Sequence, residues 1–157
     1  MEKYPLTKNG FEELEKELLN LKSVERPAVI EAIAEARAHG DLSENAEYSA
    51  AREKQSFIEG RIKQLGVILT RAQVIDPTKM TGNVVRFGAS VLVVDEDTDE
   101  EKEYQVVGDY EADIDRNKIS LSSPLAKALI GKEVGDEVIF NAPAGSKTFE
   151  ILEVIYK

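Results

Sequence analysis

The stretch YSAAREKQSFIEGRIKQLGVILTRA, residues 48–72, carries a seam of mostly apolar residues. The seam positions are Tyr48, Ala51, Gln55, Ile58, Ile62, Leu65, Leu69 and Ala72. Their spacing alternates between three and four, the heptad pattern of a helix that packs against another helix along a narrow stripe. The stretch therefore predicts a long helix with a helical partner.

A second helical pattern comes earlier in the chain. Its apolar positions are Phe11, Leu14, Leu18 and Leu21, followed after a shift in register by Val29, Ile33 and Ala36. Thr7 precedes the pattern as a candidate N-cap. The shift falls near Glu25–Pro27, and proline lacks the N–H that an α-helix needs. Either one helix is kinked there, or two helices meet.

A short connection, residues 38–44, separates the two patterns. Gly40 suits the end of the first helix, and Asp41 or Ser43 is expected to cap the second. Two helices with a short link pack antiparallel. At about 1.5 Å per residue, a helix of roughly 30 residues is about 45 Å long. We therefore expect an antiparallel coiled-coil hairpin over residues 1–76, with 38–44 at its tip.

After Asp76-Pro77 the pattern changes to short β-branched or alternating runs separated by turn residues. The expected strands are 83–87, 89–95, 102–108, 118–122, 137–140 and 148–156. One short helix is expected at Ser123–Ile130, capped by Ser122 or Ser123 and with Pro124 in its first turn. A small β-rich domain over residues 80–157 follows, and the fold class is α+β.

Charge and composition exclude several classes of protein. The net charge is −10; residues 1–75 hold 11 basic against 13 acidic residues, whereas the rest holds 9 against 17. Phosphate binding is driven largely by cations, so independent sequence-specific DNA binding is not expected. The chain has no cysteine for disulfides or thiolate sites. It also has no membrane-length apolar run and no signal-like N-terminus, which favours a cytoplasmic protein.

Asp41 and Glu44 stand three residues apart where the second helix begins. One interpretation is a capping box, in which each residue satisfies a backbone amide at the helix start. The other is an incomplete metal site, because Mg²⁺ is usually bound by one or two carboxylates together with waters and substrate phosphates. Two carboxylates are too few to hold the ion tightly, so a partner would have to complete the site.

The segment IAEARAHGDLSENAEYSAAREKQ, residues 33–55, closely resembles the signature of the Gre transcript cleavage factors. The resemblance covers the whole chain. Further similar segments are Pro5–Gly10, Ala72–Asp76, Ile119–Gly131 and Val134–Val138. Several such motifs in the right order make a chance resemblance improbable.

The resemblance implies a transcription elongation factor that enters the secondary channel of a backtracked RNA polymerase. There it would stimulate endonucleolytic cleavage of the nascent RNA 3′ segment. Asp41 and Glu44 would be the catalytic carboxylates, holding a second Mg²⁺ that is shared with the polymerase and not bound tightly by the factor alone. Ser43 would support the tip. The polymerase would perform the chemistry, so the factor is not expected to be an enzyme by itself.

The resemblance also implies two contact surfaces. Arg52, Arg37 and Lys54 would contact RNA, although charged residues on a coiled coil are usually solvated or paired one turn apart, as Glu59 and Lys63 are expected to be. A second surface, which would dock on the polymerase, comprises Ser122, Ser123, Pro124 and Leu125. Helix capping is the structural interpretation of that surface.

Three alternatives stay open. A polymerase inhibitor on the same fold would occupy the channel without promoting cleavage. The C-terminal half also resembles FKBP-type folds, which include prolyl isomerases, although fold alone does not establish activity. A structural coiled-coil adaptor would need no carboxylate chemistry.

Overall fold

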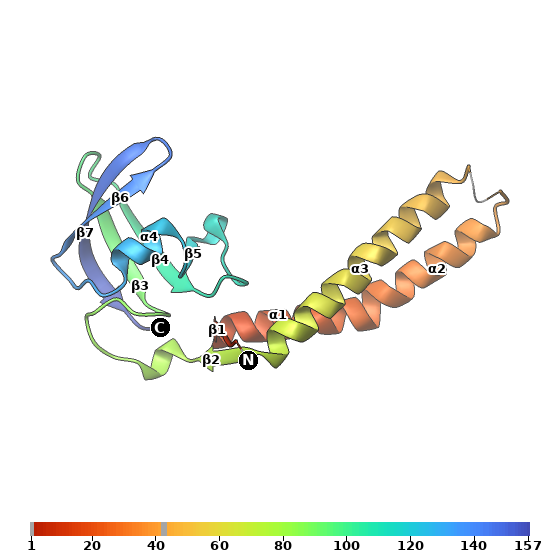
Figure 1. The fold of residues 1–157 in the computed structure, drawn as a ribbon, viewed down its shortest axis with the longest axis horizontal. Coiled ribbons are helices and arrows are strands. Elements are labelled where there is room, and N and C mark those ends of the chain that lie inside the picture. Colours follow the sequence, from red (N-terminus) through yellow and green to blue (C-terminus); the bar gives the residue numbers. More distant parts are fainter. Residues whose placement is uncertain (1, 42–43) are drawn as a thin grey trace. The chain divides into compact units, whose positions relative to one another are not determined.

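The computed structural model describes residues 2–41 and 44–157 (Figure 1). The chain divides into two compact units: Phe11–Arg71, and Met1–Gly10 together with Ala72–Lys157. This division differs from the expected domains 1–76 and 80–157 at two segments. Each segment contains a strand, and the two strands pair with each other, so the first ten residues and those that follow Arg71 belong to the second unit.

The helical unit is an antiparallel hairpin, as expected (Figure 1). Helix α1 (Lys8–Asn20) continues through a π-helical turn (Leu21–Glu25) into α2 (Arg26–Arg37), and α3 (Ala46–Thr70) returns along them. The buried seam contains Leu14, Leu21, Val29, Ile33, Ala36, Ala51, Ile58, Leu65 and Ile68. All but Ile68 are positions that the two helical patterns predicted.

The shift in register near Pro27 is neither a break nor a simple proline kink. The Arg26 amide donates to the Leu21 carbonyl five residues back, which is the hydrogen bond of a π turn. Such a turn accommodates one extra residue, so the apolar stripe changes register while the helix continues. Pro27 lies in the first turn of α2, directly after this wide turn.

Ion pairs join the two arms of the hairpin. Arg26 forms two hydrogen bonds to Glu59, at 2.8 and 2.7 Å, and Arg61 forms two to Glu17, at 2.6 and 2.9 Å. The expected pairing of Glu59 with Lys63 was wrong, because the Glu59 carboxylate binds the planar guanidinium of the facing helix instead. Paired hydrogen bonds of this kind match arginine to a carboxylate better than one lysine contact does.

The second unit contains two strands that the sequence patterns did not predict. Strand β1 (Tyr4–Thr7) pairs in parallel with β2 (Ala72–Ile75). Ala72 was expected to continue the helical seam, but α3 ends at Thr70. Each strand is only four residues long, so neither is recognisable without its partner. The expected N-cap is confirmed: the Thr7 hydroxyl accepts from the Gly10 amide at 3.1 Å.

The remaining strands form a sheet in the order β5-β4-β3-β7-β6 (Figure 1). Their bounds are Ser90–Asp95 (β3), Glu101–Val107 (β4), Lys118–Ser120 (β5), Glu137–Ala142 (β6) and Gly145–Ile155 (β7). Helix α4 (Pro124–Leu129) contributes Leu125, Ala126 and Leu129 to the core. The α+β class is thereby confirmed.

One expected strand, 83–87, was wrong. Val85 donates to the Lys132 carbonyl at 2.7 Å and accepts from the Gly131 amide at 2.8 Å, so its backbone bonds are made to an irregular loop. The acidic residues after Asp95 form the turn between β3 and β4. Among the residues described, no helix is both long enough and apolar enough to cross a membrane.

Candidate functional site at the hairpin tip

Helix α2 ends shortly before Gly40, the residue that was expected to mark its C-terminus. The last helical residue is Arg37, and the amides of Ala38 and His39 still donate to carbonyls of the final turn. Gly40 has φ +116°, a conformation that residues with a Cβ rarely adopt. The chain can therefore turn sharply out of the helix at this position.

The N-cap of α3 is Asn45. Its Oδ1 accepts from the Tyr48 amide at 3.0 Å, and its Nδ2 donates to the Ala36 carbonyl at 2.8 Å. The expected cap, Asp41 or Ser43, was therefore wrong. Asparagine ranks with aspartate and serine as an N-cap, so the sequence carried the signal, but three candidates lay within one short segment.

Because Asn45 caps the helix, the capping-box interpretation of the two carboxylates does not hold. Glu44 precedes the cap, whereas a capping box needs its glutamate three residues after the cap. Asp41 lies in the loop, and both side chains belong to exposed residues. Ser43, expected to support the tip, lies outside the residues that the structure describes.

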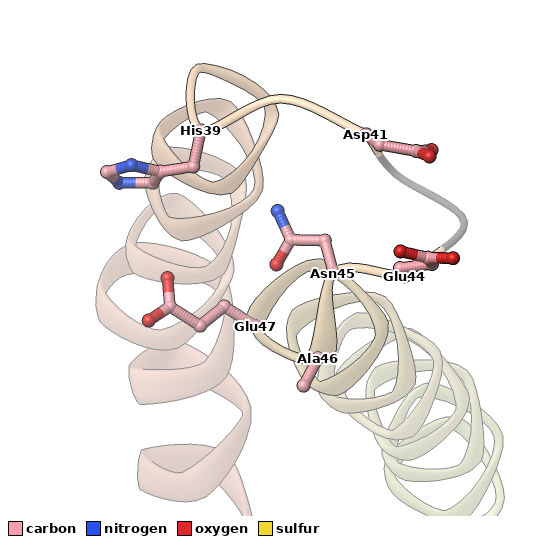
Figure 2. Close-up of a pocket in the computed structure, with 6 residues that line it drawn as sticks. All are labelled: His39, Asp41, Glu44, Asn45, Ala46 and Glu47. Atoms are coloured by element: carbon pink, nitrogen blue, oxygen red, sulfur yellow. The ribbon is translucent and has the colours of Figure 1, made fainter.

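Figure 2 shows how the tip side chains lie. The carboxylates of Asp41 and Glu44 point to one side of the tip, and the side chains of His39 and Glu47 point to the other. An open hollow is lined by His39, Asp41, Glu44, Asn45, Ala46 and Glu47. The two carboxylates that the sequence singled out thus occur together on an exposed surface.

The donor set of this surface suits a hard cation only in part. Carboxylate oxygens are the ligands that Mg²⁺ prefers, and the N-terminal end of α3 favours negative charge beside it. Within residues 2–41 and 44–157, no group of three or more metal-ligating side chains is gathered. Asp41 and Glu44 fit a role as some of the ligands of an ion whose other ligands come from elsewhere.

The candidate RNA contacts divide into two groups. Arg37 and Arg52 line one groove on the hairpin flank together with Ile30, Ile33, Ala34 and Gln55. Neither arginine forms an ion pair with a residue that the structure describes. Lys54 is outside this groove and faces Glu25, with 3.7 Å between Nζ and Oε2.

The candidate docking residues surround the start of α4. Ser123 caps the helix, accepting from the Ala126 amide at 3.3 Å, and Pro124 occupies its first turn. Leu125 is buried in the core. Ser122 and Pro124 are exposed, so the docking expectation rests on them.

Asp109 organises this surface. Its Oδ1 accepts hydrogen bonds from the hydroxyls of Ser120 and Ser122, the latter at 2.7 Å. These bonds favour the charged form and lower the pKa of the Asp109 carboxyl. The sequence patterns did not single out Asp109, because the turn that carries it and the segment 120–122 are brought together only by β4 and β5.

Comparison with protein-family models identifies both halves of the chain. Residues 4–74 match the N-terminal domain of the GreA/GreB transcription elongation factors, and residues 80–156 match their C-terminal domain. The chain belongs to the GreA/GreB family of transcription elongation factors. The family that the motifs indicated is thereby confirmed.

Individual GreA/GreB relatives are similar over their full lengths. The chain is 62% identical over 156 residues to transcription elongation factor GreA of Ruegeria pomeroyi and 59% identical over 156 residues to that of Paracoccus denitrificans; each alignment covers 99% of both chains. Among solved structures, the transcription factor Gfh1 is 30% identical, with a TM-score of 0.47, over 98% of this chain and 99% of the other.

Proposed function

We propose that this protein stimulates endonucleolytic cleavage of the RNA 3′ segment in backtracked RNA polymerase. The observation that carries the proposal is the placement of Asp41 and Glu44 on one side of the hairpin tip. Helix capping is done by Asn45, so that structural task does not account for the two carboxylates. Full-length relatives named as transcription elongation factors support the same conclusion.

The hairpin is suited to reaching a confined site. Helix α3 has 25 residues, which corresponds to roughly 37 Å at about 1.5 Å per residue. Among the residues that the structure describes, its ion pairs with the other arm lie along the length of the hairpin. We infer that this arm enters the secondary channel of the polymerase and carries its tip to the catalytic centre.

At that centre Asp41 and Glu44 would hold Mg²⁺ jointly with the polymerase. When bound there, the ion would polarise the phosphate that is cut and lower the pKa of its bound water. The contribution of this chain is to present two oxygen ligands on an arm already ordered by helix packing. Two ligands without the polymerase are too few for tight binding, and we infer that the isolated factor does not cut RNA.

The flank of the hairpin supplies positive charge where the RNA would pass. Arg37 and Arg52 share one groove, and cations near a phosphate chain stabilise it. Ser122 and Pro124 are the exposed candidates for docking on the polymerase. A factor of this kind acts where transcription takes place, which in a bacterium is the cytoplasm.

The test uses reconstituted, backtracked elongation complexes with labelled RNA. Wild-type protein is expected to release short 3′ fragments, and an Asp41→Asn, Glu44→Gln variant to lower the cleavage rate by roughly 100-fold or more. That variant keeps the side-chain shapes, so it should compete with the wild-type factor for polymerase at an unchanged concentration.

Three results separate the alternatives. Loss of cleavage with retained competition supports the proposal. Binding without any cleavage by the wild-type protein would indicate a channel-binding inhibitor. Undiminished cleavage by the double variant would contradict the role of the carboxylates.

A further inference from the structure

The Asn45 side chain joins the two helices of the hairpin at the tip. Its carbonyl oxygen caps α3 through the Tyr48 amide at 3.0 Å, and its amide nitrogen donates to the Ala36 carbonyl, near the end of α2, at 2.8 Å. Both polar atoms of one half-buried side chain are thus used, one on each helix.

The Ala36 carbonyl is a specific target for this donor. Carbonyls in the last turn of a helix have no intrahelical amide donor four residues on, so they accept from other donors. Ala36 is 2% exposed and lies in the helix seam; its carbonyl also accepts from the His39 amide at 3.2 Å. Water has little access there, so the Asn45 amide supplies a donor that solvent would not readily replace.

Only an asparagine meets all these requirements. Aspartate and serine cap a helix as well as asparagine does. However, an ionised aspartate has no donor for Ala36, and a serine side chain is too short to span both contacts. Glutamine carries the same amide on a longer stem and is not a favoured cap. The bridge to Ala36 therefore restricts the residue type at position 45 more than the cap on α3 does.

The bridge ties Ala36 to Asn45, and in the sequence these two residues flank both carboxylates, Asp41 and Glu44. Glu44 directly precedes Asn45, and Asp41 follows the turn at Gly40. Because Ala36 and Tyr48 are both bonded to the Asn45 side chain, the end of α2 and the start of α3 are held at a set separation. We propose that Asn45 is a positioning residue, and that its bridge sets where Asp41 and Glu44 stand relative to each other.

This inference rests on the proposed function, because the cleavage reaction is what makes the position of the carboxylates matter. Catalysis depends steeply on such placement: a misplacement of about 1 Å can lower a rate about 100-fold. The bridge itself is a property of the free protein, so it can be tested with and without the polymerase.

The test compares Asn45→Ser with the wild-type protein. Serine keeps the cap on α3 and removes the bridge to Ala36, without adding charge. Asn20→Ser is the matched control, because Asn20 is exposed and makes no side-chain cap bond. Circular dichroism checks that helix content is the same in all three proteins.

The first measurement is backbone ¹⁵N relaxation in the free protein. In Asn45→Ser, the order parameters of the Asp41 and Glu44 amides should fall toward about 0.6, the value found in flexible backbone. In Asn20→Ser they should not fall. The second is the cleavage rate at saturating factor, which should fall about tenfold to 100-fold. The factor concentration that gives half the maximal rate should change less than about twofold.

The outcomes are separable. Unchanged order parameters in Asn45→Ser would overturn the inference whatever the polymerase does. A wild-type cleavage rate in that variant would also overturn it, as would a loss that saturating factor restores. If the wild-type protein itself promotes no cleavage, the proposed function fails, and the relaxation measurement alone decides whether the bridge orders the tip.

Discussion

Thr7 and Glu111 are joined by two hydrogen bonds across most of the sequence. The Thr7 amide donates to Glu111 Oε1 at 2.7 Å, and the Thr7 hydroxyl donates to Oε2 at 2.6 Å. The Gly108 amide donates to the same Oε1 at 2.9 Å. One carboxylate therefore ties β1 to the turn that follows β4.

Replacing Glu111 should destabilise the unit that contains it. Glu111→Ala leaves the Thr7 and Gly108 amides without their acceptor, and Thr7 is 3% exposed. We expect the free energy of unfolding to fall by about 2 kcal/mol, the usual cost of orphaned buried donors. Urea titration followed by tyrosine fluorescence measures this, because the Tyr4 and Tyr110 rings pack 5.1 Å apart beside the contact.

Glu103→Ala is the control for that experiment. Glu103 forms an exposed pair with Lys157, and such pairs contribute about 0–1 kcal/mol. Equal losses in the two variants would contradict a special role for Glu111.

Two glycine-to-alanine changes should have opposite effects. A Cβ at Gly108 would lie 2.0 Å from the Pro5 carbonyl oxygen, and backbone cannot move aside as a side chain can. Gly108→Ala should cost about 1–3 kcal/mol or more. Gly60 lies within α3 with open space around it, so Gly60→Ala should stabilise the hairpin by roughly 0.8–1 kcal/mol. Thermal unfolding tests both expectations: the Tm should fall in Gly108→Ala and rise in Gly60→Ala.

Arg52→Ala should weaken cleavage and its dependence on salt together. If Arg52 contacts one phosphate of single-stranded RNA, its removal should reduce the slope of log activity against log salt by about 0.7. Lys54→Ala is the comparison, because Lys54 lies outside the groove and faces Glu25. The measurement is the cleavage rate at subsaturating factor over a range of salt concentrations; a slope unaffected by Arg52→Ala would argue against the contact.

Lowering the pH should remove the stabilisation that comes from the hydrogen bonds of Ser120 and Ser122 to the Asp109 carboxylate. Hydrogen bonds from Ser120 and Ser122 lower the pKa of Asp109 in the folded protein. A depressed folded pKa means that the stabilisation is complete above the ordinary aspartate pKa of about 3.9 and is lost as the pH falls through the folded value. NMR titration of the Asp109 carboxyl should show its pKa rise toward the ordinary value in Ser120→Ala and Ser122→Ala. No change in either variant would mean that the hydroxyls do not set it.

Periodicity was sufficient to predict the hairpin. Positions such as Leu14, Ile33 and Ile58 recur at helical spacing, and burying them requires two helices packed along one seam. The pattern even contained the change of register near Pro27, but not its cause. A π turn depends on which backbone bonds form, and one sequence is compatible with a kink, a break or a wider turn.

The strands of the β-rich unit were harder to predict from the sequence. The alternation around Val91 and Val93 marked a true strand, whereas 83–87 had similar composition and became an irregular segment bonded to Lys132. Strands β1 and β2 were not predicted, because four-residue strands have no stable existence apart from the partner that the fold supplies.

At the tip, the sequence by itself singled out Asp41 and Glu44 but left two interpretations of them. The choice depended on where α3 begins, and helix starts in a segment with several capping residues are decided by competing hydrogen bonds. Tertiary structure settled it through Ala36: among the candidate caps, Asn45 alone can donate a side-chain amide to the buried Ala36 carbonyl and cap α3 at the same time. The sequence determined which residue types lie at the tip. The packing of one helix end against the other determined that Asn45, and neither Asp41 nor Glu44, caps α3.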